Sequence, residues 1–254
     1  MKVTFLGTGA SHGIPVIGCN CEICQSNNLR DKRLRSSIFI ETDNNNNLVI
    51  DVGPDFRQQM LREKIIKIDA VLLTHNHKDH TAGLDDLRAF NYLMKKQVRI
   101  YAELEVLNTI KREYAYAFVD DKYPGAPDMD LHPIENEIFA IDNDTIIPVR
   151  GFHGKLPVLG FRTGDFAYIT DVKIIPEREK SKLAGLDVLV ISALRVKTHI
   201  AHMGLNEVLD IIKELKPRRA YLTHISHMQY SYNELTNILP ENVYSAYDGL
   251  KIDI

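Results

Sequence analysis

Four side chains of metal-binding type occur within six residues in the stretch Leu73-Thr74-His75-Asn76-His77-Lys78-Asp79-His80. This stretch continues the apolar run 70–73, which we expect to form a short buried strand. The histidines and the aspartate therefore leave the end of a strand, where open α/β sheets gather their ligands. Imidazole and carboxylate are ligands that zinc, manganese and iron share, so the spacing predicts a metal site. A solvated loop is the alternative interpretation, and it suits a lone histidine better than this pattern.

Strand patterns and helix patterns interleave on both sides of this stretch. Residues 120–133 are rich in Pro, Gly and Asp, and we expect a loop there that borders the substrate pocket. No internal repeat or linker interrupts the pattern, which predicts one layered α/β domain over residues 1–254. The predicted strands are 37–41, 48–52, 70–73, 98–102, 146–149, 158–161, 166–169, 187–191 and 220–222, and the predicted helices are 56–67, 104–118 and 206–215.

The composition limits the class of protein. The chain has 254 residues, of which 44% are hydrophobic and 26% charged, and this is enough to bury a full core. Its formal net charge is −3, so no overall positive field attracts nucleic acid. The sequence has no run of about eighteen apolar residues, so we expect no membrane span. Its first residues lead into an alternating strand rather than a signal peptide, so we expect a cytoplasmic protein.

The three cysteines of the chain, Cys19, Cys21 and Cys24, lie within six residues of one another. An odd number of cysteines at this spacing makes a poor disulfide framework, because close neighbours rarely satisfy the geometry of a bridge. In a chain without an export signal, metal binding is the better interpretation. Three buried, reduced cysteines are the alternative.

The pattern His75-x-His77-x-Asp79-His80 resembles the signature of the metallo-β-lactamase superfamily. Further motifs occur in the order that this superfamily shows. The resemblance implies a four-layer αβ/βα sandwich in a single α/β domain. The supporting motifs are Asn47-Leu48-Val49-Ile50-Asp51-Val52-Gly53, Gly151-Phe152-His153-Gly154, Tyr168-Ile169-Thr170-Asp171 and Leu222-Thr223-His224.

The resemblance also implies a site for two divalent metal ions. These would be zinc or manganese, with iron as the alternative, because all three bind imidazole and carboxylate ligands. Two such ions lower the pKa of a water between them and hold both oxygens of a displacement. Asp171 would bridge the ions, and Asp51 would orient a ligand histidine from behind, or merely cap its strand. The remaining ligands would be His75, His77 and His153 for one ion, and Asp79, His80 and His224 for the other.

The segment Gly18-Cys19-Asn20-Cys21-Glu22-Ile23-Cys24 resembles phosphoribosyl 1,2-cyclic phosphate phosphodiesterases of the carbon–phosphorus lyase pathway. In that family the three cysteines and a C-terminal histidine hold a structural zinc ion, and His227 would be the fourth ligand here. A site closed by four protein ligands stabilises a fold and leaves no position for a reacting water. The resemblance implies hydrolysis of a small, cyclic phosphodiester.

Hydrolysis of a sugar phosphodiester calls for a general acid, because an alkoxide is a poor leaving group. His202 occupies the position where the family keeps a catalytic histidine, and His199 is the alternative. Together with the ligand Asp79, His202 is the predicted catalytic residue.

Two other functions fit parts of the same pattern. A transfer-RNA 3′-processing endonuclease shares the metal ligands, but it usually carries a basic arm, and we find none. A non-hydrolytic cofactor-biosynthesis protein of the same fold would have lost catalytic ligands, whereas all seven are present here. We therefore expect a small phosphodiester as substrate and no nucleic acid or membrane partner. The resemblance also implies a homodimer.

Overall fold

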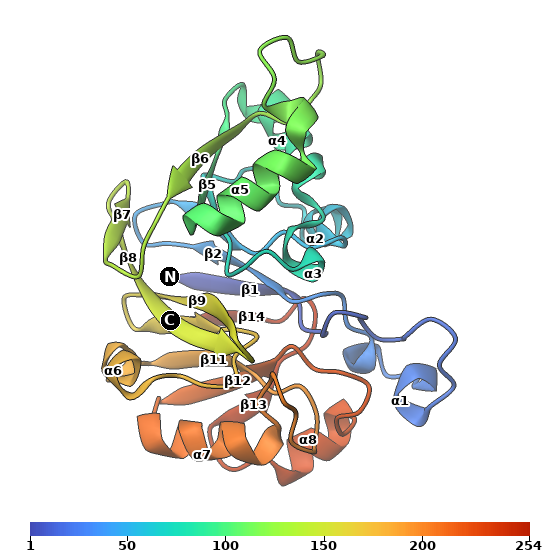
Figure 1. The fold of residues 1–254 in the computed structure, drawn as a ribbon. Coiled ribbons are helices and arrows are strands. Elements are labelled where there is room, and N and C mark those ends of the chain that lie inside the picture. Colours follow the sequence, from blue (N-terminus) through green and yellow to red (C-terminus); the bar gives the residue numbers. More distant parts are fainter.

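Two mixed β-sheets face each other in the computed structural model, which describes residues 1–254 (Figure 1). The first sheet contains the strands β1 Lys2–Gly7, β2 Ser37–Glu41, β3 Asn47–Ile50, β4 Ala70–Leu72, β5 Val98–Ala102, β6 Met129–Pro133 and β14 Lys251–Asp253. The second sheet contains β7 Phe139–Ile141, β8 Asp144–His153, β9 Leu156–Thr163, β10 Phe166–Ile169, β11 Val188–Ser192, β12 Arg219–Thr223 and β13 Val243–Ser245. Their orders are β14-β1-β2-β3-β4-β5-β6 and β13-β12-β11-β10-β9-β8-β7.

Helices cover the outer face of each sheet (Figure 1). The helices on the side of the first sheet are α2 Phe56–Glu63, α3 Lys78–Thr81, α4 Arg88–Met94 and α5 Leu104–Glu113. Those on the side of the second sheet are α6 Glu177–Lys180, α7 Leu205–Leu215 and α8 Tyr232–Ile238. The short helix α1 Glu22–Gln25 lies on a loop that projects beside the two sheets. This arrangement confirms the four-layer αβ/βα sandwich.

Three apolar clusters fill the spaces between the four layers. One cluster draws on inward-facing residues of both sheets, among them Phe5, Leu72 and Tyr168. The second joins the first sheet to its helices, and the third joins the second sheet to α7 and α8. Alternate residues of a strand face opposite sides, so central strands such as β4 and β11 are apolar on both faces and fully buried.

Parallel strands bring the functional segments to one edge of the sandwich. Strands β3 to β6 run parallel to one another, and so do strands β10 to β13. The loop with the four metal-binding side chains follows β4, while Asp51 follows β3. Asp171 and His224 follow β10 and β12 of the other sheet. Ligands of open α/β sheets bind at such carboxyl ends.

Three predicted boundaries were wrong. Residues 129–133 form β6, which pairs in parallel with β5, so the loop expected over 120–133 ends earlier. Pro133 hides this strand in the sequence, but proline is tolerated at a sheet edge. The helix expected over 56–67 ends at Glu63, because Lys64 adopts a left-handed backbone with φ 57°. The helix expected over 104–118 ends at Glu113 and continues only as a 3₁₀ turn. No helix is long and apolar enough to cross a bilayer.

Candidate metal centre

The loop after β4 is folded tightly against the strand end of β3. The backbone N–H of Val52 donates to the His80 carbonyl, and that of Gly83 donates to the Val52 carbonyl. A Cβ at Gly53 would lie only 2.1 Å from the Asp79 carbonyl oxygen, so only glycine fits there. The short helix α3 then places Asp79 and His80 one turn beyond His77, facing the second sheet.

Asp171 stands between two groups of ligand atoms. Its Oδ2 lies 3.1 Å from His80 Nε2 and 3.5 Å from His75 Nε2, and its Oδ1 lies 2.8 Å from His224 Nε2. In each group, the ligand atoms all lie within 4.8 Å of one another. The groups are Asp79, His80, Asp171 and His224 on one side, and His75, His77 and Asp171 on the other.

His153 lies beside the second of these groups but outside its 4.8 Å limit. The centroid of its ring is 5.1 Å from that of His77 and 6.0 Å from that of His75. His153 Nδ1 donates to the Ala201 carbonyl oxygen at 2.8 Å, which leaves the lone pair on Nε2. We refer to His153 and the two groups together as the histidine–aspartate cluster.

Buried nitrogens in this cluster have no hydrogen-bond partner. His75 Nε2 and both ring nitrogens of His224 are in this state, although the two side chains are only 1% and 2% exposed. The 2.8 Å contact between His224 and Asp171 therefore lacks the geometry of a hydrogen bond. Orphaned buried nitrogens are costly, and a cation between nitrogen and carboxylate satisfies both. The donor set fits divalent metal ions.

Asp51 supports the cluster from behind. Its carboxylate accepts a hydrogen bond from His80 Nδ1 at 2.7 Å and from the backbone N–H of Thr74 at 2.9 Å. The Thr74 hydroxyl lies 2.9 Å from His75 Nδ1, so Asp51 fixes the start of the histidine loop as well as the His80 ring. Fixing Nδ1 of His80 directs Nε2 toward Asp171.

Two aspartates and one histidine of the site have a left-handed backbone, a conformation that favours glycine. The φ angles are 65° for Asp51, 51° for Asp171 and 53° for His224. Each of these residues follows the end of a strand, and the left-handed turn directs its side chain into the space between the two sheets. Such conformations cost about 1–3 kcal/mol each and cluster at functional sites.

Opposite charges dominate the electrostatics of the cluster. Burial alone would raise the pKa of Asp171, but the imidazoles of His224 and His80 hold it well below its usual range. The pKa of Asp79 is lowered against burial in the same way, chiefly by His80. Burial and the neighbouring His80 lower the pKa of His75 well below its ordinary value. The ionised carboxylates and the neutral His75 ring are in the forms that bind a metal ion. Against burial, the neighbouring carboxylates raise the pKa of His80 well above its ordinary value and that of His224 to about 9, so a bound metal ion would displace a proton from each of these rings.

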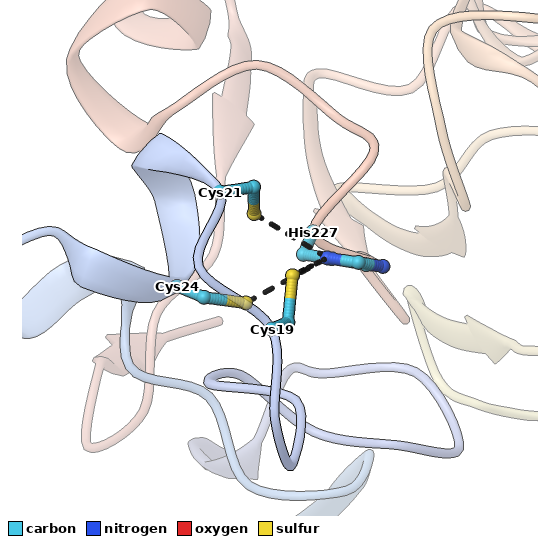
Figure 2. Close-up of side chains that lie close together, drawn as sticks. All are labelled: Cys19, Cys21, Cys24 and His227. Carbon is cyan, nitrogen blue, oxygen red and sulfur yellow. Dashed lines mark hydrogen bonds between the residues drawn. The ribbon is translucent and has the colours of Figure 1, made fainter.

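A second group of ligand atoms joins the projecting loop to the strand end of β12. The sulfurs of Cys19, Cys21 and Cys24 lie 3.2, 3.4 and 3.6 Å from His227 Nδ1, and Figure 2 shows all three pointing toward it. No disulfide is present. Thiolates and one imidazole fit a closed zinc site. We refer to these four residues as the cysteine cluster.

The two clusters share one short segment of chain. His224 belongs to the histidine–aspartate cluster and His227 to the cysteine cluster, three residues further on. Between them, Ile225 pairs with the backbone of Gly9, and its N–H donates to the Thr8 carbonyl. The projecting loop that carries the cysteines is therefore attached directly to the edge where the other ligands meet.

A family model described as a beta-lactamase superfamily domain matches residues 46–225, which include all seven residues of the histidine–aspartate cluster. The chain belongs to the beta-lactamase superfamily. Its fold is the metallo-β-lactamase fold, which implies the binding of divalent metal.

Relatives within the superfamily differ in what they are named for. The crystal structure of a new diphosphatase from the PhnP family shows 38% identity to this chain and a TM-score of 0.92, over 99% of this chain and 96% of that one. Zn²⁺-bound PqqB from Methylobacterium extorquens has a TM-score of 0.80 at 22% identity, over the full length of both chains, and shows the fold alone. A Porphyromonas gingivalis protein named octanoyltransferase is 39% identical over 99% of this chain, but the chain spans only 51% of it.

His202 and His199 lie at the open side of the histidine–aspartate cluster. His202 Nδ1 is 3.8 Å from Asp171 Oδ1, and its ring centroid lies 4.2 Å from that of His153. His199 lies on the outer side of His202, and the centroids of the two rings are 5.1 Å apart. Burial lowers the pKa of His202 to about 3, further helped by His224 and His153 and opposed by Asp171, so this ring is neutral at pH 7. A neutral imidazole still has one N–H to donate.

A cavity of about 470 Å³ opens beside the histidine–aspartate cluster, at the carboxyl ends of β4, β5 and β6. No pattern in the sequence predicted this cavity. The loop 120–133 contributes nothing to its wall, whereas residues 134–136 do. One signal was available, since Glu103 follows a predicted strand directly and so lies at the same sheet edge as the histidine loop. The polar residues of the wall are His75, Asn76, Glu103, Glu105, Glu135, Asn136 and Arg150.

Proposed function

We propose that this chain is a dinuclear-metal phosphodiesterase that hydrolyses a small cyclic phosphodiester such as phosphoribosyl 1,2-cyclic phosphate. One observation carries the proposal: both oxygens of Asp171 face imidazole nitrogens, so a single carboxylate serves two adjacent groups of ligands. A shared carboxylate reduces the repulsion between two cations held close together. The PhnP-family diphosphatase, at 38% identity, supports hydrolysis of a bond to phosphorus.

Each residue of the histidine–aspartate cluster then has a role. When bound, the two ions would supply an activated water and neutralise charge on the phosphoryl oxygens. Asp51 holds His80 in the orientation that presents Nε2. The adjacent His80 and His224 lower the pKa of Asp79, so this carboxylate remains ionised. The ligands would be His75, His77 and His153 for one ion, Asp79, His80 and His224 for the other, and Asp171 for both.

His202 is the proposed proton donor to the leaving alkoxide. It is the histidine nearest to Asp171 that belongs to neither ligand group. The imidazolium form is the one that can give a proton to an alkoxide and become a neutral imidazole. Burial lowers the pKa of His202 to about 3 in the free protein, and an anionic diester bound beside the ring would raise this pKa and favour the protonated form. His199 is the alternative donor, and its Nδ1 is already occupied by the Ala201 N–H.

The test is a metal-analysed preparation assayed against a panel of substrates. The panel contains ribose 1,2-cyclic phosphate, phosphoribosyl 1,2-cyclic phosphate, 2′,3′-cyclic nucleotides, bis(4-nitrophenyl) phosphate, a precursor transfer RNA, a thioester and a β-lactam. We expect two catalytic metal ions and one structural zinc per chain, with turnover of cyclic phosphodiesters. Turnover confined to the thioester or the β-lactam would contradict the proposal. Cleavage of the transfer RNA alone would favour the endonuclease.

The octanoyltransferase name of the bacterial relative calls for a separate inference. This chain corresponds to about half of that protein. We infer that the name describes the half outside the aligned region, since the residues gathered here are metal ligands. Transfer of an octanoyl group by this chain, measured with an octanoylated carrier protein, would contradict the inference.

A further inference from the structure

A row of buried hydroxyl groups lies next to the histidine–aspartate cluster at the ends of three neighbouring parallel strands. Thr170 follows β10 directly, and Ser192 and Thr223 are the last residues of β11 and β12. Alternation along these strands places the three side chains on the face that looks toward the core between the two sheets. Because Asp171 and His224 are the next residues after Thr170 and Thr223, the row supports two residues of the cluster.

Most of these hydroxyls have no hydrogen-bond partner within the protein. Tyr168, two residues before Thr170 on the same face, adds a fourth hydroxyl, and all four side chains are fully buried. Those of Tyr168, Ser192 and Thr223 have no partner. Thr170 lies close enough to lower the pKa of Tyr168, but that contact lacks the geometry of a hydrogen bond, and its hydroxyl donates to Asp171 Oδ1 at 3.4 Å. We refer to these four hydroxyls as the hydroxyl layer.

The ring of His224 has an unsatisfied nitrogen on the side away from Asp171. Its Nε2 lies 2.8 Å from Asp171 Oδ1, and its Nδ1 has no partner although the side chain is only 2% exposed. In two other histidines of the cluster, Nδ1 is bonded: to the Asp51 carboxylate in His80 and to a main-chain carbonyl in His153. A ligating histidine normally donates this second N–H, which fixes the orientation of the ring. His224 therefore needs an acceptor that no protein group supplies.

Water is the ligand whose chemistry fits these groups. Ser192 pairs with Thr223 across the two strands, and His224 follows Thr223 in the chain, so the unsatisfied groups occupy neighbouring positions. A water molecule can accept the imidazole N–H and donate to two hydroxyl oxygens. Buried waters typically form about three hydrogen bonds to polar groups that the protein leaves unsatisfied. An anion would be repelled by the carboxylates of Asp51 and Asp171, both of which are buried nearby.

We propose that the hydroxyl layer binds ordered water, which connects Ser192, Thr223 and Tyr168 to Nδ1 of His224 and thereby orients this ring. The three hydroxyl residues are positioning residues, because they act through His224 rather than on the reacting bond. They give the second sheet the support that Asp51 gives the first, with neutral groups in place of a carboxylate. The inference goes beyond the proposed function, since it holds for any divalent metal and any substrate at the cluster.

Variants that remove one hydroxyl without changing the shape of the side chain test the proposal. In Thr223→Val and in Tyr168→Phe the water loses one partner, so we expect the affinity for the metal ion at His224 to fall by about tenfold. Thr223→Ser retains the hydroxyl and is the matched control, with an affinity within about twofold of that of the unmodified protein. Metal titration measures both, and the zinc of the cysteine cluster is the internal reference.

The melting temperature of the metal-loaded protein distinguishes this role from a merely structural one. If the water is present, both variants break its hydrogen bonds and the melting temperature falls by a few degrees. If the hydroxyls have no partner at all, both variants remove an unsatisfied buried polar group, and the melting temperature rises. A higher melting temperature, or an unchanged metal affinity in both variants, would overturn the proposal.

A high-resolution crystal structure of the metal-loaded protein shows the water directly. We expect density for a water within about 3.2 Å of His224 Nδ1 and of the hydroxyls of Ser192 and Thr223, and its loss in Thr223→Val. A direct bond from His224 Nδ1 to a protein atom would overturn the proposal. None of these measurements needs a substrate, so a protein that hydrolyses no phosphodiester but holds this water would refute the proposed function alone.

Discussion

The cysteine cluster and the histidine–aspartate cluster are assembled in different ways. Three of the four cysteine-cluster ligands come from a single six-residue stretch on a loop that projects beside the sandwich (Figure 1). The histidine–aspartate cluster instead takes its residues from strand ends of both sheets. One site is mainly local in sequence, whereas the other exists only when the two sheets face each other.

The surroundings of the two clusters differ as well. Cys19 and Cys21 are partly exposed, and apart from His227 the cluster has little support beyond the Val16 N–H, which donates to Cys24 Sγ at 3.3 Å. In the other cluster Asp51, itself fully buried, holds His80. Four closed ligands suffice to stabilise a loop, but a site that performs chemistry needs its ligands oriented from behind.

Replacement of Asp171 by alanine is expected to have the largest effect. Loss of the shared carboxylate removes several kcal/mol of charge stabilisation, so kcat/KM should fall by about 10³-fold or more. Metal analysis should show fewer catalytic ions while the structural zinc remains. Asp165→Ala, in an exposed turn before β10, is the control. Loss of all three ions together would show that the clusters are not independent.

Replacement of His202 by glutamine tests the proton donor. We expect kcat to fall by about 10²-fold with full metal content, because general acids contribute roughly 10²–10⁴-fold. His199→Gln should change kcat by less than about threefold. The loss in His202→Gln should shrink for a diester with a 4-nitrophenol leaving group, which needs no proton. Equal effects of the two variants would refute this assignment.

Replacement of Asp51 by asparagine probes the support of His80. The expected result is a fall of about 10–100-fold in metal affinity or activity, measured by metal titration, with little change in the cysteine cluster. Asparagine retains the size of the side chain but cannot accept from His80 Nδ1 with a charged oxygen. A metal affinity within twofold of that of the unmodified protein would show that Asp51 only caps its strand.

The smallest of the expected effects is that of acidification on the cysteine cluster. Desolvation raises the pKa of Cys21, but bonds from the Cys24 backbone and His227 outweigh it and lower this pKa from 9.0 to about 6. The stabilising thiolate is thus favoured above pH 9 and lost as the pH falls through about 6. We expect zinc affinity and the melting temperature to decline over this window, with a shift of a few degrees. A pH-independent melting temperature between 8 and 5.5 would contradict this.

The same contrast explains what the sequence could reveal. The four side chains of the histidine loop are adjacent in the chain, so residue chemistry alone predicted a metal site there. His153, Asp171 and His224 are isolated in the sequence, and only the resemblance to a family assigned them. The left-handed backbone of Asp171 and the cavity wall around Arg150 depend on contacts between distant segments, which no local pattern encodes. For the fold, alternation predicted the buried strands, but it missed the short edge strand β6.

The three left-handed residues Asp51, Asp171 and His224 have an evolutionary consequence. Glycine would relax the backbone at each of them, but at Asp51 it would also remove the buried hydrogen bonds to His80 and Thr74. A gain in stability of the metal-free protein is therefore expected at the two ligand positions, Asp171 and His224. Selection for heat resistance alone would therefore erode this centre first. Its retention in a folded chain reflects selection on chemistry rather than on stability.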